Sequence, residues 1–234
     1  MRYIPYILFC FICFASCDKQ TRRMTGYDVH GIDVSHYQSH IDWDTVAAQD
    51  IRFAFMKATE GQNFVDTMFC LNWEETNRVG IKRGAYHFFR PTLNTRTQAM
   101  NFRDNVTLRP GDLPPVLDAE VTDGASKAEI IVGMQTWLSL TELHYGIRPI
   151  IYTNLNFYNK YLVGHFDNYV MWIARYNDSA QPKLAAGKSW HFWQYGNRGR
   201  LKGIKGDVDF NVFSGNIFEL EELGLAPRTV FSER

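Results

Sequence analysis

The sequence predicts a single α/β domain built as a barrel. From residue 28 onward, short apolar runs alternate with segments of helical character. Several of these runs are continuously apolar, which is typical of parallel strands buried on both faces. Polar and acidic residues recur where the runs end, and α/β barrels collect their functional groups at the carboxyl ends of their strands. A length of 234 residues suits one such domain.

Eight apolar runs are predicted as strands. They are Gly31–Val34, Phe53–Ala58, Lys82–Phe89, Pro115–Glu120, Pro149–Thr153, Val170–Ala174, Trp190–Gln194 and Val208–Val212. The first five are each followed by a segment that can form a helix. These segments are Trp43–Gln49, Thr67–Val79, Thr95–Val106, Lys127–Tyr145 and Leu155–Val163.

Local signals support the helix boundaries. Gly80 and Gly146 stand where C-terminal helix glycines belong. Ser126 precedes Glu129 with the spacing of a capping box. The later gaps, 175–189 and 195–207, show no helical period. The pattern therefore predicts an irregular TIM-like barrel of the (β/α)5(β)3 type, closed by a short helix after Phe213.

The first residues are typical of an export signal. An apolar run from Ile4 to Ala15 is shorter than the roughly 20 residues of a membrane span. It leads into Ala15-Ser16-Cys17, which resembles a bacterial lipoprotein cleavage site with Cys17 as the lipidated residue. An ordinary cleaved signal and a short uncleaved anchor are the alternatives, and all three place the domain outside the cytoplasm. The chain then divides into a signal peptide (1–17), a polar tether (18–27), the barrel (28–220) and a tail (221–234).

Charge and cysteine content exclude several classes of function. The chain carries 25 basic and 25 acidic residues, whereas nucleic-acid binders usually have a basic face. Only Arg22–Arg23 and the stretch Arg198–Lys205 are basic, and we interpret both as solvated surface. No nucleic-acid partner is predicted. Cys70 is the one cysteine outside the leader, so no internal disulfide forms, and we expect it to be buried in its helix.

Acidic residues gather at the ends of predicted strands. Asp33 ends the first strand, the fourth carries Asp118 and Glu120, and the last carries Asp209. Residues two apart on a strand point the same way, about 6.6 Å apart, so Asp118 and Glu120 should raise each other's pKa. Such a pair can keep one carboxyl protonated as a general acid near neutral pH.

Eight segments of the chain resemble, in order, the strand motifs of glycoside hydrolase family 25 lysozymes. The segments are HGIDVSHYQSHIDW, FAFMKATEG, GAYHFFRP, PVLDAEV, IIYTN, MWIARY, WHFWQY and GDVDFNVF. They span roughly residues 28–215. The resemblance implies an enzyme that hydrolyses the β-1,4 bond between N-acetylmuramic acid and N-acetylglucosamine in peptidoglycan.

The resemblance also implies roles for particular residues. Glu120 matches the general acid, and Asp118 matches the second carboxylate, which assists the substrate's own acetamido group. Asp33 and Asp209 match the remaining acidic positions of the catalytic set. The positions that match the substrate-binding groove are Lys57, Tyr86, Tyr152, Trp172, Gln194 and Asn211. The implied partners are peptidoglycan glycan strands and, through the lipid anchor, a membrane; neither a cofactor nor a metal is implied, and we expect a monomer.

Three alternatives remain open from the sequence. In a metal-dependent hydrolase, His36 and His87 would join Asp33 and Asp118 as ligands, but the chain has neither a His-x-His nor an HExxH motif. A non-catalytic wall-binding lipoprotein would use the aromatic groove without cutting. A glycosidase acting on a different acetamido-sugar polymer would share the acidic set. Chelator resistance, the Glu120→Gln variant and product analysis distinguish these three.

Overall fold

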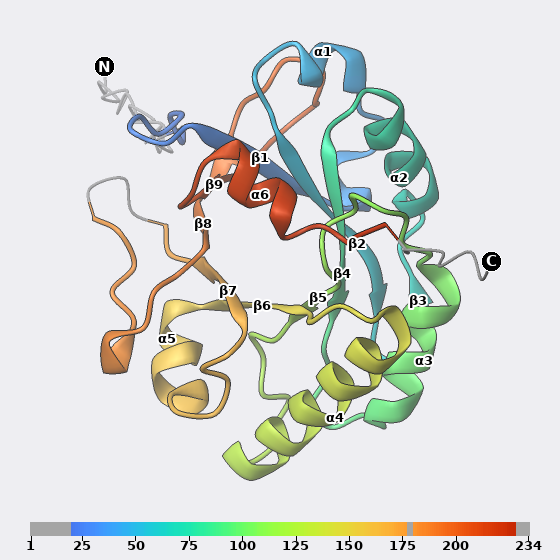
Figure 1. Ribbon diagram of the computed structural model, residues 1–234, viewed down its shortest axis with the longest axis vertical. Helices are drawn as coiled ribbons and strands as arrows, with labels where there is room; N and C mark the ends of the chain where they lie inside the picture. Colours follow the sequence, from blue (N-terminus) through green and yellow to red (C-terminus); the bar gives the residue numbers. More distant parts are fainter. Residues whose placement is uncertain (1–19, 177–179, 228–234) are drawn as a thin grey trace, which may run out of the picture.

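The computed structural model describes residues 20–176 and 180–227, in which the β-strands close into a barrel (Figure 1). Around the barrel the strand order is β1-β9-β8-β7-β6-β5-β4-β2, and pairing of β1 with β2 completes the ring. The short β3 pairs with the end of β2 only. The strands are β1 (Val29–Val34), β2 (Phe53–Glu60), β3 (Phe64–Val65), β4 (Lys82–Phe88), β5 (Val116–Asp118), β6 (Ile150–Asn154), β7 (Val170–Ala174), β8 (Phe192–Gly199) and β9 (Val208–Phe213). The predicted α/β barrel is confirmed.

The last strand runs against its neighbours. All pairings from β1 through β2 and β4 to β8 are parallel, whereas β9 is antiparallel to both β8 and β1. The first residues of β9 therefore lie at the same end of the barrel as the last residues of the other strands. This reversal, which the sequence pattern did not predict, places Asp209 directly opposite Asp33 in register.

Helices follow the first five parallel strands, as predicted. They are α1 (Trp43–Ala47), α2 (Phe69–Arg78), α3 (Thr95–Asn105), α4 (Lys127–Tyr145) and α5 (Leu155–Phe157), which continues into a π-helical turn, Tyr158–Leu162; α6 (Ile217–Glu222) follows β9. Single 3-10 turns occupy His36–Gln38 and Ala185–Gly187. Ser126 and Glu129 form the expected capping box, and Gly146 ends α4 in the left-handed conformation with φ 71°.

Aromatic side chains fill the barrel interior. Phe53, Phe55, Trp172 and Phe192 are buried there, and the rings of Phe55 and Trp172 stack with centroids 4.5 Å apart. On the neighbouring strand, a Cβ at Gly84 would lie 2.5 Å from the Phe55 ring. The interior is therefore packed solid, and a ligand that enters the ring of strands can do so only at one end of the barrel.

The N-terminal segment lies along the barrel wall. Thr21 forms a parallel bridge with Gly199, and the backbone N–H of Met24 donates to the Tyr195 hydroxyl at 3.3 Å. The Tyr27 ring packs against that of Trp193, with centroids 6.3 Å apart. The described part of the predicted tether thus contacts the fold, whereas Cys17 lies outside the described residues. Within the described ranges, no helix is both long and apolar enough to cross a bilayer.

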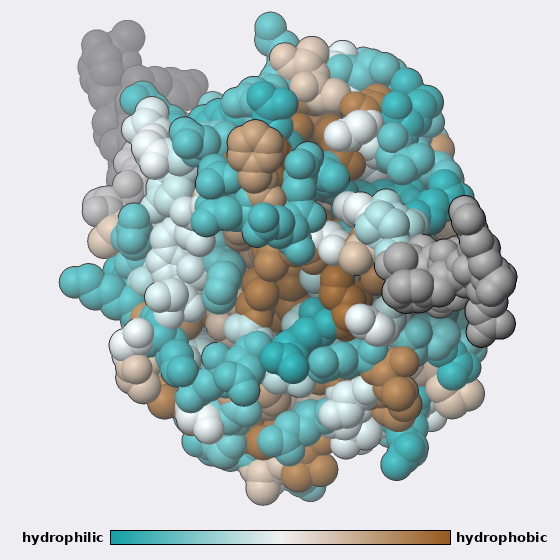
Figure 2. Space-filling view, viewed as in Figure 1, coloured by the Kyte–Doolittle hydropathy of each residue, from teal (hydrophilic) through white to brown (hydrophobic). Residues whose placement is uncertain are grey.

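The surface shows one departure from expectation. Cys70 is exposed on α2, so the prediction that it is buried was wrong. Phe69, Asn72, Trp73 and Thr76 form the buried face of this helix, and Cys70 points away from it. On the face shown in Figure 2, hydrophobic side chains gather near the middle among hydrophilic ones.

Candidate active site

Four acidic side chains meet at the mouth of the barrel. A cavity of about 250 Å³ lies at the carboxyl ends of the parallel strands and the start of β9. Its lining consists of Asp33, Val34, Ser35, Tyr37, Gln38, Lys57, Tyr86, Phe88, Asp118, Glu120, Tyr152, Trp172, Tyr176, Gln194 and Asp209. Of the ten catalytic and substrate-binding residues predicted from the sequence, nine line this cavity, and Asn211 does not.

Asp33 and Asp209 form a carboxyl pair. The side-chain amide of Gln194 donates to both, at 2.8 Å to Asp33 and 3.2 Å to Asp209. Asn211 adds a second donor to Asp33 at 2.7 Å. Burial raises the pKa of Asp33, but these hydrogen bonds oppose the rise. Burial and the neighbouring charge of Asp33 raise the pKa of Asp209 to about 9. With a pKa of about 9, Asp209 keeps its proton at neutral pH.

The two amides are held in this orientation by aromatic side chains. The Gln194 carbonyl oxygen accepts from the hydroxyls of Tyr152 at 2.8 Å and Tyr176 at 3.1 Å. The Asn211 carbonyl oxygen accepts from the Trp172 indole N–H at 2.8 Å. Each amide N–H is thereby directed at a carboxyl group. Asn211, with 0% of its surface exposed, supports Asp33 from behind.

Asp118 and Glu120 differ in burial. Strand β5 ends at Asp118, so the prediction that Glu120 belongs to the same strand was wrong. The Ala119 N–H donates to the Tyr152 carbonyl at 2.9 Å, and the chain leaves the sheet there. Asp118 is 6% exposed, and its Oδ1 has no hydrogen-bond partner among the described residues. Glu120 is more open to solvent.

Both carboxyl groups are shifted toward the protonated form. Burial raises the pKa of Asp118 well above its usual range, and the charge of Glu120 adds to the effect. Burial also raises the pKa of Glu120, with a contribution from Asp33, while a hydrogen bond with Asn154 lowers it. The positive charge of Lys57 opposes both shifts. Asp118 and Glu120 therefore keep their protons to higher pH than exposed carboxyl groups would.

Lys57 is held in place by a short chain of charges. Its Nζ lies 2.6 Å from Glu60 Oε2 and 5.0 Å from the centre of the Phe88 ring. Glu60 also pairs with Arg90 at 2.7 Å. Neither Glu60 nor Arg90 was predicted to belong to the site. Together they position the one basic side chain that lines the cavity in the described part of the chain.

Two tyrosines of the site were also missed. Tyr37 is 80% exposed at the rim, and Tyr176 is 55% exposed. Tyr37 lies in the turn after β1 and Tyr176 lies after β7, so an inspection confined to strand ends passes over both. Tyr176 and Glu120 also line a second cavity, of about 590 Å³, with Asn154, Leu155, Asn156, Ala174 and Arg175. Glu120 therefore stands between two hollows.

The histidines considered as metal ligands are engaged elsewhere. His36 Nδ1 lies 2.6 Å from Asp66 Oδ2. His87 is buried between Thr59 and Gln98, and burial lowers its pKa to about 4. Neither histidine lines the acidic cavity. Over residues 20–176 and 180–227, no group of three or more His, Cys, Asp or Glu side chains is arranged to hold a metal ion.

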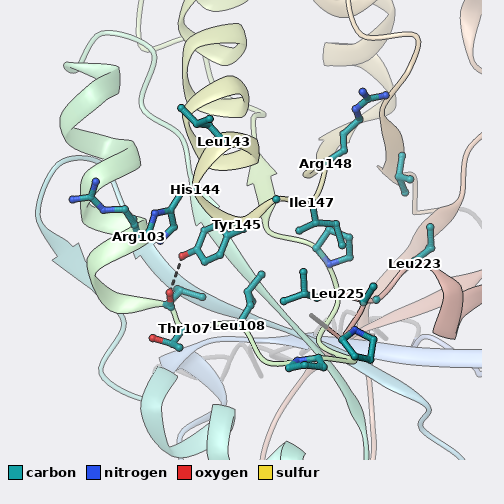
Figure 3. Close-up of a pocket in the computed structure, with 18 of the residues that line it drawn as sticks. Arg103, Thr107, Leu108, Leu143, His144, Tyr145, Ile147, Arg148, Leu223 and Leu225 are labelled. Atoms are coloured by element: carbon teal, nitrogen blue, oxygen red, sulfur yellow. Dashed lines mark hydrogen bonds between the residues drawn. The ribbon is translucent and has the colours of Figure 1, made fainter. Parts of the chain in front are cut away.

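A larger cavity, of about 1270 Å³, lies at the other end of the barrel (Figure 3). It is bordered by the residues that precede β5, β6 and β7 and by the stretch 222–227. The Tyr145 hydroxyl beside it donates to the Val106 carbonyl at 2.7 Å. In a barrel of this kind the amino-terminal end serves stability more than chemistry, and none of the four clustered acidic residues borders this cavity.

Comparison with known proteins agrees with this geometry. The model of glycosyl hydrolases family 25 matches residues 32–204. An uncharacterized protein of Escherichia coli, YegX, is 42% identical over 205 residues, covering 86% of this chain and 75% of that protein. Lysozyme M1 of Streptomyces globisporus is 35% identical over 220 residues, covering 86% of this chain and 72% of that protein.

Similarity extends to solved structures. A family 25 glycosyl hydrolase from Bacillus anthracis matches with a TM-score of 0.83 and 35% sequence identity, over 89% of this chain and 99% of that one. The family match covers most of the described barrel, including the strands that carry Asp33, Asp118 and Gln194. The chain therefore belongs to glycosyl hydrolase family 25 and is a glycoside hydrolase related to lysozyme.

Proposed function

We propose that the protein is an N-acetylmuramidase that hydrolyses the β-1,4 bond between N-acetylmuramic acid and N-acetylglucosamine, with Glu120 as general acid and Asp118 as its partner. One observation carries the assignment of roles. Glu120 stands between two hollows, while Asp118 lies buried beside it with an unpartnered oxygen. A glycan strand that occupies both hollows would cross Glu120 at a glycosidic bond.

Glu120 suits the role of acid. Burial raises its pKa, so a larger fraction keeps its proton near neutral pH than for a free glutamate. It remains accessible from both cavities, as an acid that protonates a leaving oxygen must be. When the bond breaks, its proton passes to that oxygen. A water molecule then attacks the anomeric carbon, displaces the acetamido oxygen described below, and gives its proton back to the carboxylate.

Asp118 suits the role of acceptor. Its Oδ1 is buried without a donor, which is costly unless a ligand supplies one. An acetamido N–H of the substrate is such a donor. Its hydrogen bond would favour the carboxylate form of Asp118, and the acetamido oxygen would then attack the anomeric carbon as the glycosidic C–O bond breaks. Asp33, Asp209 and Lys57 would bind sugar hydroxyls and tune the charge of the site.

The place of action follows from the substrate. Peptidoglycan lies outside the cytoplasm, and the leader favours export. We propose that Cys17 is lipidated and holds the enzyme as a monomer on a membrane, facing the periplasm or the cell surface. Incorporation of a radiolabelled fatty acid that is lost in Cys17→Ser is the expected result; equal incorporation in that variant would contradict it.

The activity is tested by mass spectrometry of the products. Purified residues 18–234 are incubated with peptidoglycan beside the Glu120→Gln variant, with circular dichroism as the control for folding. Wild-type chain should release fragments with muramic acid at the reducing end, and the variant should release none. Glucosamine at the reducing end would instead show that the other bond is cut. Retained wall binding without any product would refute hydrolysis.

A further inference from the structure

Two basic stretches that are distant in the sequence meet on one face of the barrel. The Thr21 N–H donates to the Arg198 carbonyl at 3.0 Å, and the Arg198 N–H donates back to Thr21 Oγ1 at 3.3 Å. Residues 20–23 and 198–205 thereby lie side by side, where Figure 1 shows the N-terminal segment against β8 and β9. From the sequence they are interpreted as two separate solvated stretches, whereas in the fold they form a single surface.

This surface, which we call the basic face, concentrates the positive charge of the protein. Residues 20–23 and 198–205 contain two and four basic residues respectively, and no acidic one. Because the whole chain has 25 basic and 25 acidic residues, the remainder carries six more acidic than basic side chains. Such charge asymmetry is typical of proteins that bind a polyanion or an anionic surface.

Much of this charge is not neutralised within the protein. Arg200 pairs with Asp207 at 3.0 Å, and Arg23 pairs with Asp50 at 3.5 Å. Throughout the described ranges, however, no carboxylate lies within ion-pair distance of the exposed side chains of Arg22, Lys202 and Lys205.

The basic face is also hollowed. Arg22, Arg23 and Arg200 line a depression of about 520 Å³, together with Gln20, Thr21, Gln49, Leu201 and Phe210. Three guanidinium groups thus border the depression, and those of Arg23 and Arg200 are also paired with Asp50 and Asp207. Guanidinium groups recognise phosphate oxygens with directed hydrogen bonds.

The position of this face in the chain indicates its partner. Thr21 is four positions after Cys17, so an extended chain spans at most about 14 Å between them. A lipid on Cys17 would therefore hold Thr21, and the basic residues beside it, near the membrane surface. Exposed charges act over about 8 Å at physiological ionic strength, which makes the headgroups of that membrane the nearest polyanion.

We propose that the basic face formed by residues 20–23 and 198–205 binds the phosphate headgroups of anionic phospholipids and docks the barrel on the membrane that holds its anchor. The proposal rests on the lipid anchor proposed above for its orientation, but not on the catalytic assignment. None of the residues 20–23 and 198–205 lines the acidic cavity.

The test is vesicle binding by the chain without its lipid. Residues 18–234 contain the whole closed barrel and all of its helices, and are sedimented with vesicles of phosphatidylcholine alone or with phosphatidylglycerol added. The combined variant Arg22→Gln, Lys202→Gln, Lys205→Gln removes the three unpaired charges. Each basic residue near an anionic bilayer strengthens binding about fivefold, so the three together should contribute about a hundredfold.

A matched control removes the same charge elsewhere. Arg96→Gln, Lys127→Gln, Lys160→Gln changes three exposed basic residues on α3, α4 and the π-helical turn. Wild type and control should bind phosphatidylglycerol vesicles alike, with affinity that falls as salt rises, and the basic-face variant should not. Equal losses in both variants, or wild-type binding that ignores phosphatidylglycerol, would overturn the proposal. Peptidoglycan hydrolysis should be the same in all three proteins, which separates this result from a failure of the catalytic proposal.

Discussion

Replacing Asp209 with asparagine should stabilise the protein while it impairs the enzyme. Asp209 is paired with Asp33, and its pKa is raised to about 9, chiefly by burial. A carboxyl whose pKa is higher in the folded than in the unfolded state binds more protons when folded. Its contribution to stability therefore decreases as the pH rises from the unfolded pKa, near 4, toward 9.

The size of the effect follows from the shift. Each pH unit between these limits changes the free energy of unfolding by about 1.4 kcal/mol, so at pH 7 the cost of keeping this group is at most about 4 kcal/mol. Asparagine has the shape of aspartate and does not titrate in this pH range. Its amide N–H can donate to Asp33, as the protonated carboxyl does, so the variant removes the cost and keeps the hydrogen bond.

Urea unfolding of both proteins at several pH values, followed by circular dichroism, measures this difference. The stability of Asp209→Asn relative to wild type should be near zero at pH 4 and should increase steadily toward pH 8. Glu222→Gln, a substitution of an exposed carboxylate on α6, is the control and should give no such trend. A pH-independent difference between Asp209→Asn and wild type would refute the proposed protonation of the pair.

Three further substitutions test the packing and the rim of the site. Arg83 is 1% exposed, and its Nε donates to Asp112 at 2.7 Å. Asp112→Ala leaves Arg83 as an uncompensated buried charge and should lower the free energy of unfolding in urea by about 3–5 kcal/mol. Replacing both partners, by Arg83→Met with Asp112→Leu, should restore most of that loss. Leu117→Ala removes a fully buried side chain of β5 and should cost about 2–5 kcal/mol, and a loss under 1 kcal/mol in the same assay would argue against its packing. Tyr37→Ala should raise KM for glycan several-fold at nearly constant kcat, whereas Tyr37→Phe should match wild type, since an exposed ring at the rim would act by stacking; a loss confined to kcat would assign Tyr37 to the chemistry.

Much of the fold was predictable because its signals are local. The caps at Ser126 and Gly146 bracket α4 at the residues expected, and Val170–Ala174 was predicted with the bounds that β7 has. Strand direction has no such signal. An apolar run has the same sequence pattern whether it forms a parallel or an antiparallel strand. The reversal of β9 and the pairing of Asp209 with Asp33 therefore appear only in the three-dimensional structure.

The site was predictable where its residues lie on strands. Asp33, Lys57, Asp118 and Gln194 were found because barrel chemistry gathers at strand ends. Tyr37 and Tyr176 lie on turns, whose geometry depends on tertiary contacts such as the Tyr176–Gln194 hydrogen bond.

Contacts between residues far apart in the sequence were likewise not predictable. Asn211 was assigned to the groove through the family resemblance, but it is buried behind Asp33 and supports that side chain. The basic face depends on a bridge between Thr21 and Gly199, which joins residues too far apart for any sequence pattern to relate.

The arrangement of β9 also bears on how the chain folds. This strand enters the sheet between β8 and β1, so the first strand of the barrel gains its second neighbour only when almost the whole chain has been made. Contacts between residues so distant in sequence form slowly. A nascent chain whose residues 208–213 have not yet left the ribosome has unpaired edges on β1 and β8 and lacks Asp209. For the export proposed above this order is favourable, because a polypeptide that is still unclosed during translocation completes both its barrel and its acidic cluster on the side where it is to act.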